Sequence, residues 1–319
     1  MLKAYCLSHR KDVDGLGSGS LAVAATAGRI LLTDYDDIVQ NLRRIPSNAE
    51  RVVISDLGAD SADFPQFLEE IRRISANAKV TYIDHHFMSD VAKRKLEETG
   101  IQLVHNVKEC ASILTYQTFR DVLPDGAKLI ALCGAVTDYM DDSPVAKKMM
   151  ERAERHFVLL EATMLSFALG NHSDEEGYPE MLVGELAKMK RPDEIKGVPE
   201  SALAQLGKEA VLEEEVKADG VKKGNLAYIV TRRYSTSIAS KVLLGAFDVK
   251  VGVALKEKQP GWYEVSLRST SDSRVHLGRS IGKIAAGLGG SGGGHRRAAG
   301  CRIPKSRMEE MIAALTKKA

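Results

Sequence analysis

A short apolar segment that leads into acidic residues recurs along the first half of the chain, and this recurrence limits the fold more than any other feature. Residues 51–55 lead into Asp56, and residues 80–83 lead into Asp84. Segments with helical features lie between the apolar runs. Strands that alternate with helices predict an α/β fold with a doubly wound parallel sheet. The carboxyl ends of parallel strands share one edge, where ligands bind, so the acidic residues should gather there.

The same pattern extends the expected sheet and adds a second domain. The expected N-terminal elements are strands at 2–7, 29–33, 51–55, 80–83 and 101–104, with helices at 16–27, 34–44, 60–75, 88–99 and 111–119. A polar segment with two prolines at 191–199 indicates a linker, and 200–218 a connecting helix. Strands at 226–231, 249–255 and 263–268, with a helix at 237–244, then predict a smaller mixed-sheet α/β domain. A length of 319 residues suits domains at 1–190 and 219–319 joined by 191–218.

Composition places the protein in a broad class. Apolar residues make up 44% and charged residues 28% of the chain, as in ordinary globular proteins. We find neither a run of 18 apolar residues nor a charged and then apolar leader, so we expect a cytoplasmic protein without membrane contact. The four cysteines are scattered mainly within apolar runs and predict buried thiols; they are Cys6, Cys110, Cys133 and Cys301.

Charge is unevenly distributed. From Lys256 onward, 13 basic residues stand against 5 acidic ones, whereas the preceding part of the chain is net acidic. An acidic N-terminal part suits divalent cations, and a basic C-terminal part suits phosphates. Both distributions also fit solvated surfaces, so charge alone does not decide between functions.

The triplet Asp84-His85-His86 follows the apolar run at 80–83 directly. A strand that ends in a carboxylate and two imidazoles predicts metal ligands at its tip. Taken alone, the triplet also fits a polar loop in which Asp84 caps a helix.

Further candidate ligands stand in two other segments. The loop after the first strand contains His9, Asp12 and Asp14 before Gly15, and the apolar run at 129–136 leads to Asp138. Two carboxylates at alternating positions can both face a metal pocket, although such a sequence also occurs in turns. Carboxylate and imidazole side chains are hard and borderline metal ligands.

A glycine-rich segment at 287–300 contains Gly292, Gly293 and Gly294, followed by His295 and Arg297. Glycine exposes backbone amides, and the histidine and arginine add donors, so the segment predicts a loop that binds phosphate. Arg268, in the preceding strand, could join this site. A flexible linker is the alternative interpretation.

Together these motifs resemble the DHH phosphoesterase superfamily and its DHH-associated C-terminal domain. They span residues 9–300 in the family's order. The resemblance implies two divalent cations, usually Mn²⁺, with Asp56 bridging them and with Asp84 and His86 at the substrate. The implied ligands are His9, Asp12 and Asp56 for one ion, and Asp14, Asp56, His85 and Asp138 for the other. His9 lies three residues before Asp12, whereas the family pattern has two or four.

The resemblance is nearest to the two-domain oligoribonucleases, or nanoRNases, and the related pAp phosphatases. It implies a manganese-dependent phosphodiesterase that cleaves very short oligonucleotides to mononucleotides, with a homodimer as an option. Aromatic residues are 5% of the chain, which offers little stacking surface for a long strand. Open alternatives are a pAp phosphatase, a cyclic-dinucleotide hydrolase, a RecJ-like single-strand exonuclease, a small-molecule or polyphosphate phosphatase, and a non-catalytic nucleotide-binding module.

Overall fold

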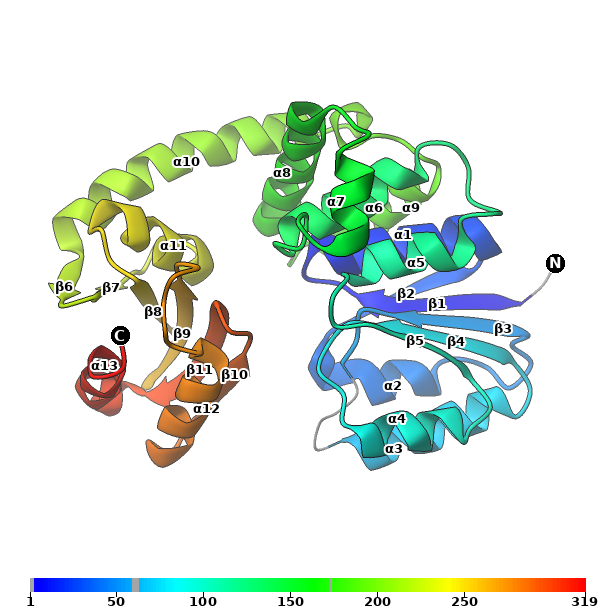
Figure 1. Cartoon of the computed structure of the whole chain (residues 1–319), viewed down its shortest axis with the longest axis horizontal. Coiled ribbons are helices and arrows are strands. Elements are labelled where there is room, and N and C mark those ends of the chain that lie inside the picture. The colour runs from blue at the N-terminus through cyan, green and yellow to red at the C-terminus, as the bar shows by residue number, and fades with distance from the viewer. Residues whose placement is uncertain (1–2, 59–62, 173) are drawn as a thin grey trace. The chain divides into compact units, whose positions relative to one another are not determined.

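The computed structural model describes residues 3–58, 63–172 and 174–319. The chain divides into two compact units between Gln205 and Leu206, inside helix α10 (Val198–Asp219). Each unit is built on a sheet with helices on both faces (Figure 1). No helix in the described part of the chain is both long enough and apolar enough to cross a bilayer.

The sheet of the first unit is parallel throughout, which confirms the predicted fold class. Its strand order is β2-β1-β3-β4-β5. In this doubly wound order the connections leave β1 and β3 in opposite directions, which opens a crevice beyond their carboxyl ends. The strands are β1 (Ala4–His9), β2 (Arg29–Thr33), β3 (Arg51–Ser55), β4 (Lys79–Asp84) and β5 (Gln102–His105).

Side chains along these strands alternate between two apolar layers. Val52 and Tyr82 pack on one face with α2 (Ile38–Arg43), α3 (Phe64–Ser75) and α4 (Asp90–Glu97). Val53 and Ile83 pack on the other face with α1 (Val13–Thr26) and α5 (Ala111–Phe119). Burial on both faces explains why the sequence shows continuous apolar runs rather than alternating polar residues.

Several predicted helix boundaries differ from the structure. Helix α1 begins at Val13 rather than residue 16, because the Asp12 side chain accepts a hydrogen bond from the Gly15 amide and caps the helix. The helix expected at 34–44 is the 3-10 turn η1 (Tyr35–Asp37) followed by α2. Helix α3 begins at Phe64, and its predicted start at residue 60 lies outside the described residues.

Four helices form a further layer over α1 and α5 (Figure 1). The apolar run at 129–136 belongs to the first of them, where Ile130 and Ala131 are buried. These helices are α6 (Ala127–Thr137), α7 (Pro144–Met150), α8 (Arg155–His172) and α9 (Tyr178–Ala187), and the 3-10 turn η2 (Pro192–Glu194) follows them.

The second unit contains the predicted mixed sheet, which has six strands rather than the three that the sequence indicated. Its order is β10-β11-β9-β8-β7-β6, in which the β7–β8 pair is parallel and the other pairs are antiparallel. Helix α11 and part of α10 cover one face, and α12 and α13 the other. The elements are β6 (Val221–Lys223), β7 (Leu226–Val230), α11 (Thr236–Ala246), β8 (Val251–Gln259), β9 (Trp262–Ser269), α12 (Leu277–Gly287), β10 (Ser291–Gly294), β11 (Ala298–Pro304), η3 (Lys305–Arg307) and α13 (Met308–Thr316).

The glycine-rich segment is partly a strand, so its description as a loop was wrong. Residues 291–294 form β10, which pairs with β11 across a short turn. A Cβ at Gly292 would lie 2.4 Å from the Cys301 Cβ, and one at Gly278 would lie 1.8 Å from the Gly294 carbonyl oxygen. Gly292 therefore lets β10 pack closely against β11, and Gly278 in α12 lets that helix approach β10, so a flexible linker is excluded.

The four cysteines are free and buried, as predicted. Burial raises the pKa of the Cys6 and Cys301 thiols to about 12. Both side chains therefore act as small apolar groups near neutral pH.

Candidate metal centre

The side chains predicted as metal ligands meet at the carboxyl edge of the first sheet. His9 ends β1, Asp56 follows β3, and His85 follows β4. Asp12 and Asp14 come from the start of α1, and Asp138 caps the end of α6. Ligand atoms of His9, Asp12 and Asp56 lie within 4.8 Å of one another, and so do those of Asp14, His85 and Asp138.

In the first cluster, His9 is held between two acids. Its Nδ1 lies 2.8 Å from Asp12 Oδ2 and 3.7 Å from Asp56 Oδ2. Its Nε2 is buried and has no hydrogen-bond partner among the described residues. A Cβ at Gly15 would lie 2.4 Å from the His9 carbonyl oxygen, so glycine is required where the helix start approaches β1. The unusual three-residue spacing thus brings His9 and Asp12 into contact.

In the second cluster, His85 lies among three acids. Its Nε2 is 3.3 Å from Asp56 Oδ1 and 3.8 Å from Asp14 Oδ2, and its Nδ1 is 3.7 Å from Asp138 Oδ2. The backbone amides of Ala111 and Ser112 donate to the two Asp14 oxygens at 2.8 and 2.9 Å. The start of helix α5 therefore fixes the orientation of the Asp14 carboxylate.

Asp56 connects the two clusters. Its Oδ2 faces His9, and its Oδ1 faces His85. Its backbone has φ of 56°, in the left-handed region that non-glycine residues seldom adopt. A conformation of this kind costs about 1–3 kcal/mol and is found mainly at functional sites. The Asp56 amide donates to the Ile83 carbonyl oxygen at 3.0 Å, which holds this conformation against β4.

The acids repel one another in the absence of a cation. Burial, and then the charge of Asp56, raise the pKa of Asp14 to about 6. Burial, and then the charge of Asp14, raise the pKa of Asp138 to about 8. Burial opposes ionisation of Asp56 too, but hydrogen bonds from His85 and His9 outweigh it and hold its pKa below the usual range. A divalent cation would reverse this repulsion.

His86 points to a different set of partners from His85. Its Nδ1 lies 2.8 Å from Oδ1 of Asp84, which is fully buried, and its Nε2 lies 2.9 Å from the Tyr35 hydroxyl. Burial lowers the pKa of His86, but Asp84 outweighs burial and raises it overall. His86 also lies within 4.8 Å of the Asp56 and His85 ligand atoms, so the ring borders the metal pocket while both nitrogens are bonded elsewhere.

The predicted phosphate-binding residues of the second unit surround the β10–β11 turn. The His295 amide donates to the Ala298 carbonyl oxygen at 2.7 Å, and the Ser269 amide donates to the Arg297 carbonyl oxygen at 3.0 Å. Arg268 is the cross-strand partner of Ala298, and its Nη2 donates to Ser237 Oγ at 2.6 Å. The segment from Gly292 to Arg297 and the Arg268 strand thus belong to one end of this sheet.

Comparison with known proteins identifies the second unit. Residues 216–319 match the DHHA1 domain family. The match covers nearly all of the second unit. None of the curated proteins matches the sequence well enough to show a relationship.

Solved structures share the fold of this chain over nearly all of its length. A DHH-domain protein described as a member of a family of ribosomal proteins is 18% identical, with a TM-score of 0.71 over 99% of this chain and 86% of its own. The pGpG-specific phosphodiesterase PggH from Vibrio cholerae is 16% identical, with a TM-score of 0.59 over 98% of each chain. RecJ from Thermus thermophilus, in complex with Mn²⁺, is 14% identical, with a TM-score of 0.63 over 99% of this chain and 51% of RecJ.

The donor set fits the divalent cations that the resemblance to DHH phosphoesterases implies. His9 Nε2 is a buried nitrogen without a hydrogen-bond partner in the described part of the chain. The pKa values of Asp14 and Asp138 are raised, so these two acids would gain from added positive charge. Carboxylate and imidazole donors together suit Mn²⁺.

Sequence reasoning missed two residues of this edge, Asp34 and Tyr35. Asp34 Oδ1 lies 3.7 Å from His9 Nε2, and Asp34 also pairs with Lys11. The Tyr35 ring lies 4.8 Å from the His9 ring and 5.8 Å from the His86 ring, measured between centroids. The signal was available, because Asp34 follows β2 directly and so repeats the strand-then-acid pattern.

Proposed function

We propose that this chain is a metal-dependent phosphodiesterase that cleaves very short oligonucleotides to mononucleotides. The observation that carries the proposal is Asp56, whose two oxygens face two adjoining ligand clusters. A carboxylate in that position suits a bridge between two divalent cations, with Mn²⁺ as the expected ion. Two such cations would provide hydroxide near neutral pH and neutralise charge on the phosphate.

The proposed ligands follow the two clusters. His9, Asp12 and Asp56 would hold one cation, and Asp14, Asp56, His85 and Asp138 the other. The amides of Ala111 and Ser112 keep the Asp14 carboxylate in place before any cation arrives. Such preorganisation reduces the cost of assembling the site.

His86 is proposed to bind the substrate phosphate. An ionised Asp84 has no proton to donate, so His86 Nδ1 must donate to Asp84 Oδ1. This hydrogen bond fixes the orientation of the His86 ring. The raised pKa of His86 favours the form with protons on both nitrogens. In that form Nε2 donates, and an arriving phosphate oxygen can share or replace the Tyr35 hydroxyl as its acceptor.

Two observations support the proposed substrate class. PggH, which this chain matches over 98% of both lengths, is a phosphodiesterase specific for pGpG, a two-nucleotide substrate. Aromatic residues make up only 5% of the chain, which offers little stacking surface for a long strand. We therefore favour short substrates and propose that the β10–β11 turn binds a second phosphate of the same molecule.

The substrate proposal is tested by one panel of reactions with Mn²⁺. We expect pApA and pGpG to be hydrolysed with higher kcat/KM than longer RNA, pAp, cyclic dinucleotides or polyphosphate. Product analysis by chromatography should show mononucleotides. Preference for pAp, polyphosphate or long RNA would refute the proposed substrate, and no hydrolysis of any phosphate ester would refute the enzyme.

His85→Ala and His86→Ala should have different effects although the residues are adjacent. His85→Ala should weaken Mn²⁺ binding by at least about tenfold, because its ring lies among three acids. His86→Ala should leave Mn²⁺ affinity near wild type and lower kcat, because both of its nitrogens bond other groups. Calorimetric titration with Mn²⁺ measures the difference. Equal weakening by both changes would contradict the division of roles.

Tyr35→Phe should lower kcat about tenfold, the lower limit for losing a hydrogen bond to a charged group. The change removes the hydroxyl bonded to His86 Nε2 but keeps the ring beside His9. Mn²⁺ dependence should not change. Tyr5→Phe, in strand β1, is the matched control and should keep full activity. A shifted Mn²⁺ dependence with unchanged kcat would place Tyr35 at the metals instead of at His86.

A further inference from the structure

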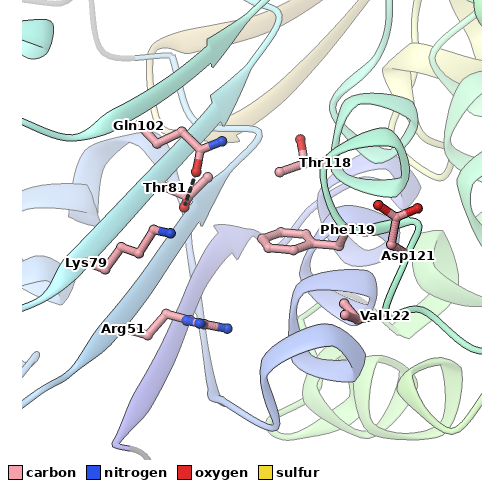
Figure 2. Close-up of a pocket in the computed structure, with 8 residues that line it drawn as sticks. All are labelled: Arg51, Lys79, Thr81, Gln102, Thr118, Phe119, Asp121 and Val122. Carbon is pink, nitrogen blue, oxygen red and sulfur yellow. Dashed lines mark hydrogen bonds between the residues drawn. The ribbon is translucent and has the colours of Figure 1, made fainter.

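A polar pocket lies at the edge of the first sheet that is opposite the metal centre. It has a volume of about 300 Å³ and is formed by the amino ends of β3, β4 and β5 and by the end of helix α5. The metal-centre residues follow the carboxyl ends of the strands, so the two sites are separated by the length of the sheet. The pocket is lined by Arg51, Lys79, Thr81, Gln102, Thr118, Phe119, Asp121 and Val122 (Figure 2).

Two cations stand side by side in this pocket. Arg51 and Lys79 begin neighbouring strands and are Cα partners, so their side chains share one face of the sheet. Figure 2 shows both side chains extending toward the Phe119 ring. Within the described residues, neither side chain forms an ion pair with a carboxylate. Like charges directly opposite each other destabilise a sheet, and a bound anion would remove that cost.

The other walls suit a flat, polar ring beside the anion. Thr81 Oγ1 donates to Gln102 Oε1 at 3.3 Å, which leaves the Gln102 amide hydrogens for a ligand. The Thr118 hydroxyl donates to the Leu114 carbonyl oxygen at 2.7 Å and so can accept. The half-buried Phe119 ring supplies an apolar wall for stacking.

The negative charges near the pocket are weaker than the positive charges of Arg51 and Lys79. Helix α5 ends at Phe119, and its C-terminus carries about half a negative charge. The Asp121 side chain is 90% exposed and lies 3.3 Å from Arg120. Another pocket, in the DHHA1 domain, is less suited to an anion, because the charges of its Lys258 and Lys305 are each paired with a glutamate.

We propose that this pocket binds a nucleoside monophosphate. The phosphate lies between Arg51 and Lys79, the base stacks on Phe119, and the Gln102 amide donates to an acceptor on the base. The volume is at the small end of ligand pockets, which suits one nucleotide and excludes a longer chain. This inference does not rest on the metal centre, although a mononucleotide is also the product of the proposed reaction.

Methyl NMR on the full-length protein with Mg²⁺ tests the proposal, using Val122 at the pocket rim as the reporter. AMP and inorganic phosphate should shift the Val122 methyl signals to saturation, and adenosine should bind at least about tenfold more weakly. Arg51→Gln and Lys79→Gln should each weaken AMP binding about tenfold, the lower limit for a charged hydrogen bond. Arg29→Gln is the matched control, because Arg29 also begins a strand of this sheet and does not line the pocket.

The same titration separates this site from the metal centre. In Asp56→Asn protein the AMP shift at Val122 should persist, whatever that variant does to hydrolysis. Absence of a Val122 shift with AMP, equal binding of adenosine, or equal effects of Arg51→Gln and Arg29→Gln would overturn the proposal. A lowered Tm in both pocket variants would also overturn it, because the cations would then support the fold.

Discussion

Asp56→Asn should lower kcat on pApA by more than about a hundredfold. Changing a residue that only hydrogen-bonds to a metal ligand typically lowers activity about ten- to a hundredfold, and a bridging ligand should matter more. Asparagine keeps the shape of aspartate and tolerates a positive φ, so the backbone at 56° need not change. The variant loses one negative charge where two clusters meet. Initial rates with Mn²⁺ saturation curves measure the effect, and activity within tenfold of wild type would contradict a bridging role.

The metal dependence of stability gives a second measurement on the same variant. Mn²⁺ should raise the Tm of wild-type protein, because a ligand that binds the folded state stabilises it by mass action. The rise should be much smaller for Asp56→Asn. Asp36→Asn is the matched control, since Asp36 is exposed in the nearby turn η1 and belongs to neither cluster. An equal rise in both variants would show that the cation binds elsewhere.

The metal-free Asp56→Asn protein should melt at a lower temperature than metal-free wild type near pH 7. Hydrogen bonds from His85 and His9 outweigh the burial penalty and keep the Asp56 pKa below the usual range. A lowered carboxyl pKa in the folded state contributes stability above the ordinary pKa, and that stability is lost as pH falls. Removing the charge therefore removes more attraction to His85 and His9 than repulsion from the neighbouring acids.

The positions of the candidate ligands could be predicted because strand ends are a local property of the sequence. Asp56 and the residues after β4 each follow an apolar run, and parallel strands deliver their carboxyl ends to one edge. The contact between His9 and Asp12 also has a local cause. A tight turn in which Gly15 packs against the His9 carbonyl brings the two side chains together across their three-residue spacing.

Other features depend on contacts between distant residues and could not be read from the sequence. Asp14 is oriented by amides of α5, 97 and 98 residues further along the chain. The partnership of Tyr35 with His86 joins the ends of two strands that are not neighbours in the sheet. The glycine-rich segment looked like a loop because glycine is rare in strands, whereas here β10 uses it to approach β11 closely.

His295→Ala should lower kcat/KM on pApA about ten- to a hundredfold, the usual effect of losing a charge-assisted donor to phosphate. The same change should hardly affect bis-p-nitrophenyl phosphate, which has a single phosphate and needs only the metal centre. Arg268→Ala should behave likewise. The controls are His156→Ala and Arg302→Ala, both at exposed positions, with Arg302 toward the end of β11 that is farther from the turn.

The ratio of the two kcat/KM values distinguishes a substrate contact from a structural one. If the turn binds a second phosphate, pApA loses that contact in the variant. Bis-p-nitrophenyl phosphate has no second phosphate, so its hydrolysis should not change. Binding energy from a remote phosphate positions the scissile bond, so the loss should appear in kcat as well as KM. Backbone bonds hold His295 in the turn through its amide, and alanine keeps them, so the fold should survive the substitution. An equal loss of kcat/KM on both substrates would show that His295 supports the fold or the metal centre. The proposal that the turn binds a second phosphate would then be wrong.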